Sequence, residues 1–425
     1  MINVGSMIGS GIFLVPATIA LYLHSSLLII LVWVMGGIVS LFGALSIAEL
    51  GAIFPKAGGQ YVYLREAYGP LWGFLYGWTA FTVIMCAAIS AVAVGFATYL
   101  TSFFPLTATG IKLVAIISIL LLTAVNCFGV KLGAVIQNGL TIIKILMLGA
   151  FAVMGLFMRN GGPGSQGAGH PFSLTDLAGP FGLALVAVLW SYDGWIEITY
   201  VAGEVKNPQK NIPQSLIIST VLVIFIYILI NITYMSVLSI SAISTSTLVA
   251  ADAATKIFGS KGAVLAAACV IIALLGTNNG FVLTGARIYY AMASEKLFFH
   301  SLAKIHPSYR TPIPSLLAQG FWASLLVLTG SFNQLFTYVI FASWIFYAMT
   351  VAGVIVLRKR SPALTRPYST WGYPITPVIF IIFSLYLVFN TIIEDPRDAL
   401  IGLGIILAGL PAYFHWRRST GNATH

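Results

Sequence analysis

Residues 5–16 read GSMIGSGIFLVP, and this stretch decides the fold. It places three glycines and two serines within the seven residues from Gly5 to Gly11. Glycine costs about 1 kcal/mol relative to alanine inside a helix, so a continuous helix is disfavoured here. In a membrane, irregular backbone survives only where it is buried in protein or lines a cavity. The Gly5-x-x-x-Gly9 spacing also fits a small-residue face for helix packing, so this stretch alone leaves both interpretations open.

The composition around this stretch is that of a membrane protein. The 425 residues are 59% hydrophobic and 8% charged, with a mean hydropathy of +0.97. A soluble domain has about a quarter of charged residues, so most of this surface must face lipid. Spans of ~20 apolar residues give room for about a dozen helices. We therefore expect an all-α polytopic membrane protein whose residues 1–425 form a single membrane domain.

Apolar runs between turn and charge signals predict twelve spans. They cover residues 2–23, 27–54, 70–103, 111–130, 132–158, 178–204, 213–240, 262–293, 313–331, 334–357, 374–393 and 398–416. Residues 159–177 and 241–261 are expected to be the longer outside loops. With both termini cytoplasmic, fifteen Lys and Arg lie in inside loops and five lie outside. This excess of basic residues predicts that orientation.

The sixth predicted span contains a second interruption. Residues 183–204 read LALVAVLWSYDGWIEITYVAGE, which places Ser191, Asp193 and Gly194 at mid-depth. An aspartate near the bilayer centre costs about 2.5–3.5 kcal/mol, so we expect it to be functional or paired. Spans 1 and 6 correspond if helices 1–5 and 6–10 are inverted repeats. Paired interruptions in corresponding helices indicate a transport site at the membrane midplane.

The chemistry of two interrupted helices predicts the class of ligand. The half-helix after a break offers free N–H groups and a positive dipole end to an anion. The half-helix before a break offers free carbonyls to an ammonium group. A zwitterionic α-amino acid satisfies both. We expect Ser10 and Gly11 to face its carboxylate, and carbonyls near Met7, Ile8 and Trp190 to face its amine. The complete predicted site is Met7, Ile8, Gly9, Ser10, Gly11, Trp190, Ser191 and Asp193.

Several motifs in order resemble the amino acid–polyamine–organocation superfamily, and most of all its bacterial members related to L-type amino acid transporters. They are GSMIGSGIF at 5–13, AELGAIFPKAGGQYVYLREAYGP at 48–70, SYDGW at 191–195, AGEVKNPQKNIPQS at 202–215, TVAGVIVLRKR at 350–360 and RPYSTWGYPITP at 366–377. The resemblance spans essentially the whole chain.

This resemblance implies a LeuT-like fold of two inverted five-helix repeats plus two helices, with broken helices 1 and 6. The repeats correspond to residues 1–158 and 178–357, and helices 11 and 12 to residues 374–416. It also implies alternating access and amino acid transport without sodium, with Trp190 closing over the substrate from outside. Relatives have a further half-helix before the glycine motif, so we expect a truncated sequence or a mis-assigned start at Met1.

Lys144 lies within QNGLTIIKILMLGA, far from either end of the apolar fifth span. A lysine can extend its ammonium group to the nearer interface, but this position is too deep for that to be favoured. In the resembling transporters, a lysine here replaces the cation of sodium-coupled relatives and contacts helices 1 and 8. We expect Lys144 to bond the carbonyls of the first break or to couple transport to protons.

Other polar residues have structural interpretations as well as functional ones. Asp193 either caps the second half-helix or contacts the substrate amine. We expect Glu49 and Glu204 to form cytoplasmic gating pairs with basic loop residues. Asn278 and Asn279 either face the cavity or bond neighbouring helices, and we favour the second interpretation. Tyr347 either lines the pocket or packs among aromatic residues.

No nucleophile–base pair, metal-ligand spacing or phosphate loop appears in the sequence, so we expect no enzyme activity, no cofactor and no nucleic acid partner. The predicted function is sodium-independent secondary transport of neutral L-amino acids in a bacterial plasma membrane, by exchange or uptake. The expected partners are the amino acid and membrane lipid. An amino acid sensor and a polyamine or cationic amino acid permease remain as alternatives. A channel would need a continuous polar lining, which the sequence lacks.

Overall fold

The computed structural model describes residues 1–157, 174–329, 332–394 and 396–421. These residues form helices and connecting turns, without any strand among them. In this part of the chain, nine helical segments are long and apolar enough to cross a membrane. Three shorter apolar helices join them, at Gly11–Tyr22, Gly179–Ser191 and Ile313–Thr329. Together they match the twelve predicted spans and confirm the prediction of an all-helical polytopic membrane protein.

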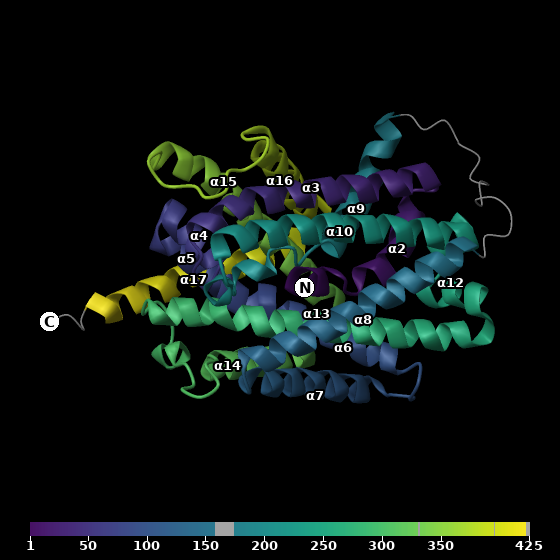
Figure 1. Ribbon diagram of the computed structural model, residues 1–425, viewed down its shortest axis with the longest axis horizontal. Coiled ribbons are helices and arrows are strands. Elements are labelled where there is room, and N and C mark those ends of the chain that lie inside the picture. Colours follow the sequence, from purple (N-terminus) through teal and green to yellow (C-terminus); the bar gives the residue numbers. More distant parts are fainter. Residues whose placement is uncertain (158–173, 330–331, 395, 422–425) are drawn as a thin grey trace.

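The spanning helices follow the predicted order (Figure 1). They are α1 (Ile2–Met7) with α2 (Gly11–Tyr22), α3 (Ser26–Ile53), α5 (Pro70–Thr79) with α6 (Met85–Leu100), α7 (Ala108–Cys127), α8 (Val130–Phe157), α9 (Leu174–Ser191), α10 (Pro208–Val237), α13 (Gly262–Ser294), α14 (Ile313–Thr329), α15 (Phe332–Arg360), α16 (Ile375–Glu394) and α17 (Pro396–Gly421). A π-helical turn, η1 (Ala80–Ile84), joins α5 to α6.

Short helices connect the spans, and two of them lie where the sequence predicted an outside loop. These connecting elements are α4 (Gln60–Tyr68), α11 (Ile240–Thr245), α12 (Val249–Phe258) and the 3-10 turns η2 (Glu197–Thr199), η3 (Ala202–Glu204), η4 (Gly259–Lys261) and η5 (His300–Ala303). The predicted loop 241–261 therefore consists largely of α11 and α12. Their buried apolar residues, such as Ile243 and Val249, pack into the core. The other predicted outside loop, 159–177, lies mostly outside the described residues.

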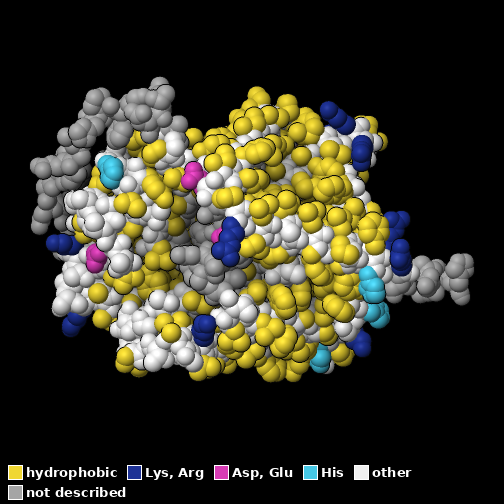
Figure 2. Space-filling model, turned by 180° about the vertical axis from the view of Figure 1, so that it is seen from behind, with side chains coloured by type: hydrophobic (Ala, Val, Ile, Leu, Met, Phe, Trp, Pro, Cys, Tyr) yellow, Lys and Arg dark blue, Asp and Glu magenta, His cyan; other side chains and the backbone are white. Residues whose placement is uncertain are grey.

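Lipid-facing and inward-facing residues alternate with the period of a helix. Helix α8 shows this most clearly, because its buried residues recur every three or four positions: Gly133, Gln137, Thr141, Lys144 and Leu148. Its Val135, Leu146 and Phe157 are exposed instead. Hydrophobic side chains cover most of the molecular face in Figure 2. This arrangement places Lys144 inside the bundle, where α1 packs against α8, α10 and α13.

Candidate substrate site

The first break is a short non-helical segment between α1 and α2. Helix α1 ends at Met7, and α2 begins at Gly11. The backbone N–H groups of Ser10, Gly11 and Ile12 donate to no group in the described part of the chain. The start of α2 therefore presents free donors and the positive end of a helix dipole at this point.

The second break lies directly against the first. Helix α9 ends at Ser191, and the chain continues into the 3-10 turn η2 rather than into a second α-helical half. A Cβ on Gly11 would lie 2.7 Å from the Cα of Ser191, and one on Gly194 would lie 2.9 Å from the carbonyl carbon of Ser6. Only glycine allows these two approaches. Close packing and helix interruption, the two interpretations of the glycine-rich stretch, therefore both apply.

Lys144 braces the first break from α8. Its Nζ donates to the carbonyl oxygens of Gly5 at 2.8 Å, Ile8 at 2.7 Å and Ala273 at 2.9 Å. An ammonium group has three hydrogens, so these acceptors use all of them. The side chain is 1% exposed. Lys144 was expected to contact the first and eighth predicted spans, which are α1 and α13, and it does. Its role in transport stays a prediction.

Tyr227 of α10 joins the two breaks, and it was absent from the predicted site. Its hydroxyl lies 2.6 Å from the carbonyl oxygen of Met7 and 2.9 Å from that of Ser191. A hydroxyl group has one hydrogen, so it cannot bond both carbonyls fully at once. The Met7 carbonyl also accepts from the Gly9 N–H at 2.8 Å, so the Ser191 carbonyl is the one that keeps capacity for another donor. A tyrosine in the middle of the apolar run VLVIFIYILI was the available signal in the sequence.

Replacing Tyr227 with phenylalanine should therefore destabilise the empty protein more than the substrate-bound protein. The change leaves the buried Met7 and Ser191 carbonyls without this donor, which costs about 1–3 kcal/mol. We expect a lowered unfolding temperature that a saturating amino acid partly restores, as measured by thermal unfolding of the purified protein. Tyr386→Phe on α16 is the control, because this hydroxyl lies beside Gly182 of α9, nine residues before Ser191. Equal unfolding temperatures for Tyr227→Phe and the wild type would contradict this account.

Asp193 does not cap a second half-helix, and that interpretation was wrong. The turn η2 begins after Ile196 without a side-chain cap. The Oδ1 of Asp193 instead accepts a hydrogen bond from the Tyr347 hydroxyl of α15 at 2.7 Å. Tyr347 also packs against Trp195 and Trp344, so it is both a packing and a lining residue.

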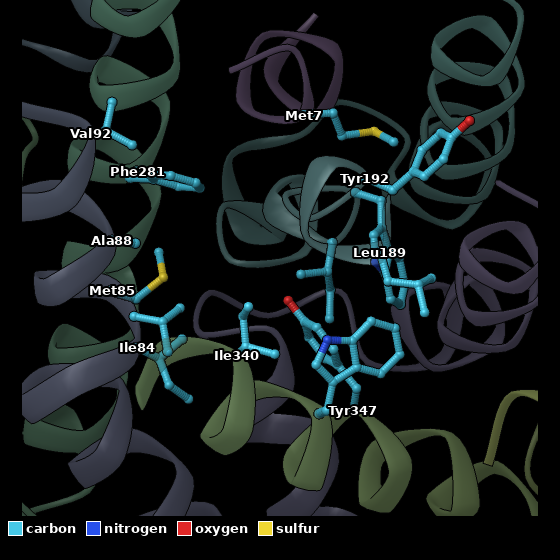
Figure 3. Packing of buried hydrophobic residues seen from close by; sticks show 14 of the residues in the cluster. Met7, Ile84, Met85, Ala88, Val92, Leu189, Tyr192, Phe281, Ile340 and Tyr347 are labelled. Carbon is cyan, nitrogen blue, oxygen red and sulfur yellow. The ribbon is translucent and has the colours of Figure 1, made fainter. Parts of the chain in front are cut away.

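Two cavities adjoin the breaks. A groove of about 420 Å³ runs between α2 and α9, from Ser10, Gly11 and Trp190 at the breaks to Tyr22 at the end of α2. A closed cavity of about 10 Å³ lies beside Asp193 and Tyr347. Figure 3 shows the apolar walls of this region: Met85 and Phe281 point inward from α6 and α13, opposite Met7 and Leu189, with Ile340 and Tyr347 on α15.

Ion pairs close the end of the molecule that carries α4 and the C-terminus (Figure 1). Glu49 is 1% exposed and receives two hydrogen bonds from Arg358, at 2.9 and 2.6 Å. Glu204 pairs with Arg287 at 3.0 Å. The predicted pairs therefore form, but both of these partners lie on helices instead of loops. Arg366, which follows α15, is a further partner of Glu49 at 3.4 Å.

The connecting helix α4 contributes to the same closed end. Arg65 pairs with Glu295, the residue that follows α13, and the Tyr61 hydroxyl donates to the same carboxylate at 2.7 Å. Burial raises the pKa of Tyr61 to about 12, so its hydroxyl remains a donor at neutral pH. These contacts tie α4 to the end of α13.

Asn279 bonds neighbouring helices, as the sequence indicated. Its amide donates to the Oε1 of Gln137 on α8 at 2.9 Å, and its Oδ1 accepts from Asn126 on α7 at 2.9 Å. This cluster holds α7, α8 and α13 together next to Lys144. Through Gln137, whose amide nitrogen would clash with a Cβ on Gly5, it also packs against α1.

Comparison with known proteins identifies the family of this chain. The family model described as amino acid permease matches residues 1–410. The chain is 35% identical to the serine/threonine exchanger SteT of Bacillus subtilis (strain 168), over 98% of this chain and 94% of that protein. It is 33% identical to the b(0,+)-type amino acid transporter 1 of Mus musculus, over 97% of this chain and 85% of the relative. The large neutral amino acids transporter small subunit 2 of Mus musculus is 35% identical, with 97% and 78% covered. The predicted resemblance is therefore confirmed, and the chain belongs to the amino acid permease family of membrane transporters.

Proposed function

We propose that this permease exchanges neutral L-amino acids across the plasma membrane by alternating access, without sodium. The observation that carries the proposal is the contact between the two breaks. Free N–H donors at the start of α2 lie at this contact, beside backbone carbonyls that share the one hydrogen of Tyr227. An α-amino acid backbone supplies the matching carboxylate and ammonium groups.

The carboxylate end of the proposed site is the start of α2. The backbone N–H groups of Ser10 and Gly11 donate no hydrogen bond to the described residues, and both residues line the groove. A carboxylate there would also be stabilised by the helix dipole. Gly9 shapes the approach, because a Cβ at this position would lie 3.2 Å from the Oγ1 of Thr277.

For the amine end we propose a smaller set of carbonyls than the sequence predicted. The Ile8 carbonyl already accepts from Lys144 at 2.7 Å and from Thr277 at 3.1 Å, which uses both of its lone pairs. Ile8 therefore belongs to the brace around Lys144 and not to the amine site. The Met7 carbonyl likewise has two donors, the Gly9 N–H at 2.8 Å and the Tyr227 hydroxyl at 2.6 Å. We assign the amine to the carbonyls of Ser191 and Trp190, with Asp193 next to them.

The hydrogen bonds of Lys144 support sodium independence. Its side-chain nitrogen donates to the carbonyls of α1 and α13, where a coupling cation would otherwise bind. The groove at α2 and α9 reaches the breaks, while ion pairs close the opposite end. With both termini cytoplasmic, this conformation faces outward. The inverted-repeat boundaries, the cytoplasmic termini and a bacterial plasma membrane belong to the same proposal.

Counterflow in proteoliposomes tests this function. With potassium as the only alkali cation, labelled serine should enter vesicles preloaded with unlabelled serine at least about tenfold faster than it enters empty vesicles. An exchanger returns to the outside only with a substrate bound, and empty vesicles offer it none. Equal entry into both kinds of vesicle would contradict exchange. Binding without entry would support the sensor alternative, and displacement by putrescine or lysine but not by neutral amino acids would support the cationic permease.

A further inference from the structure

The closed cavity beside the second break contains an unusual set of polar groups. Asp193, Glu197 and Ser343 line it, together with Tyr347. The Ser343 Oγ is buried without a hydrogen-bond partner, and its residue is 3% exposed. A buried hydroxyl facing two carboxyl groups indicates that the cavity holds something that protein atoms alone do not supply.

Neither carboxyl group has a basic partner within the described residues. The ion pairs there involve other acids, namely Glu49, Glu66, Glu204 and Glu295. Glu197 is 3% exposed, and its carboxylate accepts a hydrogen bond from Thr284 of α13. The titratable groups facing it are all acids: Asp193 on its own segment, Tyr76 on α5, Tyr200 after η2, Tyr289 on α13 and Tyr347 on α15.

Electrostatics and size restrict what neutralises these carboxyl groups. An unpaired charge removed from water costs several kcal/mol, and two carboxylates facing one cavity repel each other. The cavity volume of about 10 Å³ is that of a single water molecule at most. The side chain of a cationic amino acid does not fit into this space, and a proton needs no space at all.

We propose that Glu197 carries one proton while this cavity is closed and releases it when the cavity opens during transport. The proposal builds on the alternating-access function above. Glu197 is chosen over Asp193 because it is more deeply buried and lacks the tyrosine hydrogen bond that Asp193 receives. Its protonated carboxyl can donate to Asp193 or Ser343, either directly or through one water.

The surroundings of Glu197 link the proton to movement. The next residue, Ile198, donates its N–H to the Oδ1 of Asn3 on α1 at 2.8 Å, so the turn that holds Glu197 moves with the first half-helix. On the α4 side, the cavity is walled by Tyr76, Tyr200 and Gln60, whose side chains form a hydrogen-bonded chain at 2.7 and 3.2 Å. When these three side chains move apart, water reaches Glu197. Low pH therefore favours closure, and high pH favours the open, deprotonated form.

Infrared titration of the purified full-length chain in lipid nanodiscs tests the proton directly, without transport. We expect the wild type at neutral pH to show a C=O stretching band of a protonated carboxyl that disappears in alkaline buffer. Glu197→Gln should lack this band, and Glu394→Gln, which removes an exposed carboxyl at the end of α16, should keep it. Identical spectra for the wild type and Glu197→Gln would overturn the proposal. Loss of the wild-type band on adding sodium chloride at constant pH would overturn it in favour of a metal cation.

The pH dependence of serine counterflow tests the link to transport. On the alkaline side of the titration, the protonated fraction and the wild-type rate should fall about tenfold per pH unit. Glu197→Gln is permanently neutral, so its ratio of acid to alkaline rates should lie near one, whereas Glu394→Gln should follow the wild type. An unchanged profile in Glu197→Gln would overturn the coupling. Absence of serine exchange at every pH would reject the proposed function, and the infrared result would still decide whether Glu197 holds a proton.

Discussion

Replacing Lys144 with alanine is expected to slow amino acid exchange by at least about 100-fold while the protein remains folded. The change removes the donor shared by the carbonyls of Gly5, Ile8 and Ala273, which lie 2.7–2.9 Å from its Nζ. Hydrogen bonds to a charged group contribute about 1.5–3 kcal/mol each. Loss of the two bonds to the first break, about 3 kcal/mol, corresponds to a factor of about 100 in the population of the binding-competent break.

Serine counterflow at matched protein density measures this effect, with thermal unfolding of the same preparation as the folding control. Lys131→Ala is the matched variant, because Lys131 lies on the same helix α8 but is exposed at its start. It should exchange serine at the wild-type rate. Lys144→Arg should also be impaired, since a planar guanidinium group cannot reproduce three converging bonds to carbonyls. Wild-type exchange by Lys144→Ala would show that the break holds its shape without the lysine.

The breaks themselves were predictable because their causes are local. Glycine and serine weaken a helix wherever they cluster. An aspartate at mid-depth in an apolar span is costly, so it indicates a functional or paired residue. Both signals are readable within a dozen residues, at 5–16 and at 191–195. The position of Lys144 came from the family resemblance combined with its depth in the span.

Long-range partners were not predictable in the same way. Tyr227 meets Met7 across 220 positions of sequence, and no periodic pattern reports such a contact. The cavity at Glu197 likewise depends on side chains from η2, α13 and α15 that meet only in the folded bundle. The predicted spans also treated residues 192–204 as helical, because an apolar run does not distinguish 3-10 turns from an α-helix.

The amine site shows why the predicted residues were only partly assigned to the correct role. An interruption exposes several carbonyls at once, and the sequence treats Met7 and Ile8 alike. Their donors are visible only in the folded protein. Lys144 and Thr277 use the lone pairs of Ile8, and the Gly9 N–H and the Tyr227 hydroxyl use those of Met7. Ser191 has only the Tyr227 hydroxyl, for which it competes with Met7. A carbonyl that competes for a donor is the better acceptor for an incoming ammonium group.

Replacing Gly194 with alanine should have the second large effect, a loss of exchange of about 100-fold or more. Its φ of +98° is a conformation that residues with a Cβ rarely adopt, at a cost of about 1–3 kcal/mol. The new Cβ would also lie 2.9 Å from the carbonyl carbon of Ser6, and backbone at that distance must move. Forcing extra volume into a packed contact costs a further ~1–3 kcal/mol. The two breaks would separate, and their donors and acceptors would no longer meet one ligand.

Gly149→Ala provides the matched control for this substitution. Gly149 lies inside α8, away from proline, and a Cβ there would meet nothing within 4 Å. Alanine is favoured over glycine in a helix by about 1 kcal/mol, so this variant should unfold at or above the wild-type temperature. Serine counterflow and serine binding by the purified protein, measured for both variants, separate a distorted site from an unfolded chain. A Gly194→Ala protein that binds and exchanges serine like the wild type would show that the two breaks need not touch, and the proposed backbone clamp would then be wrong.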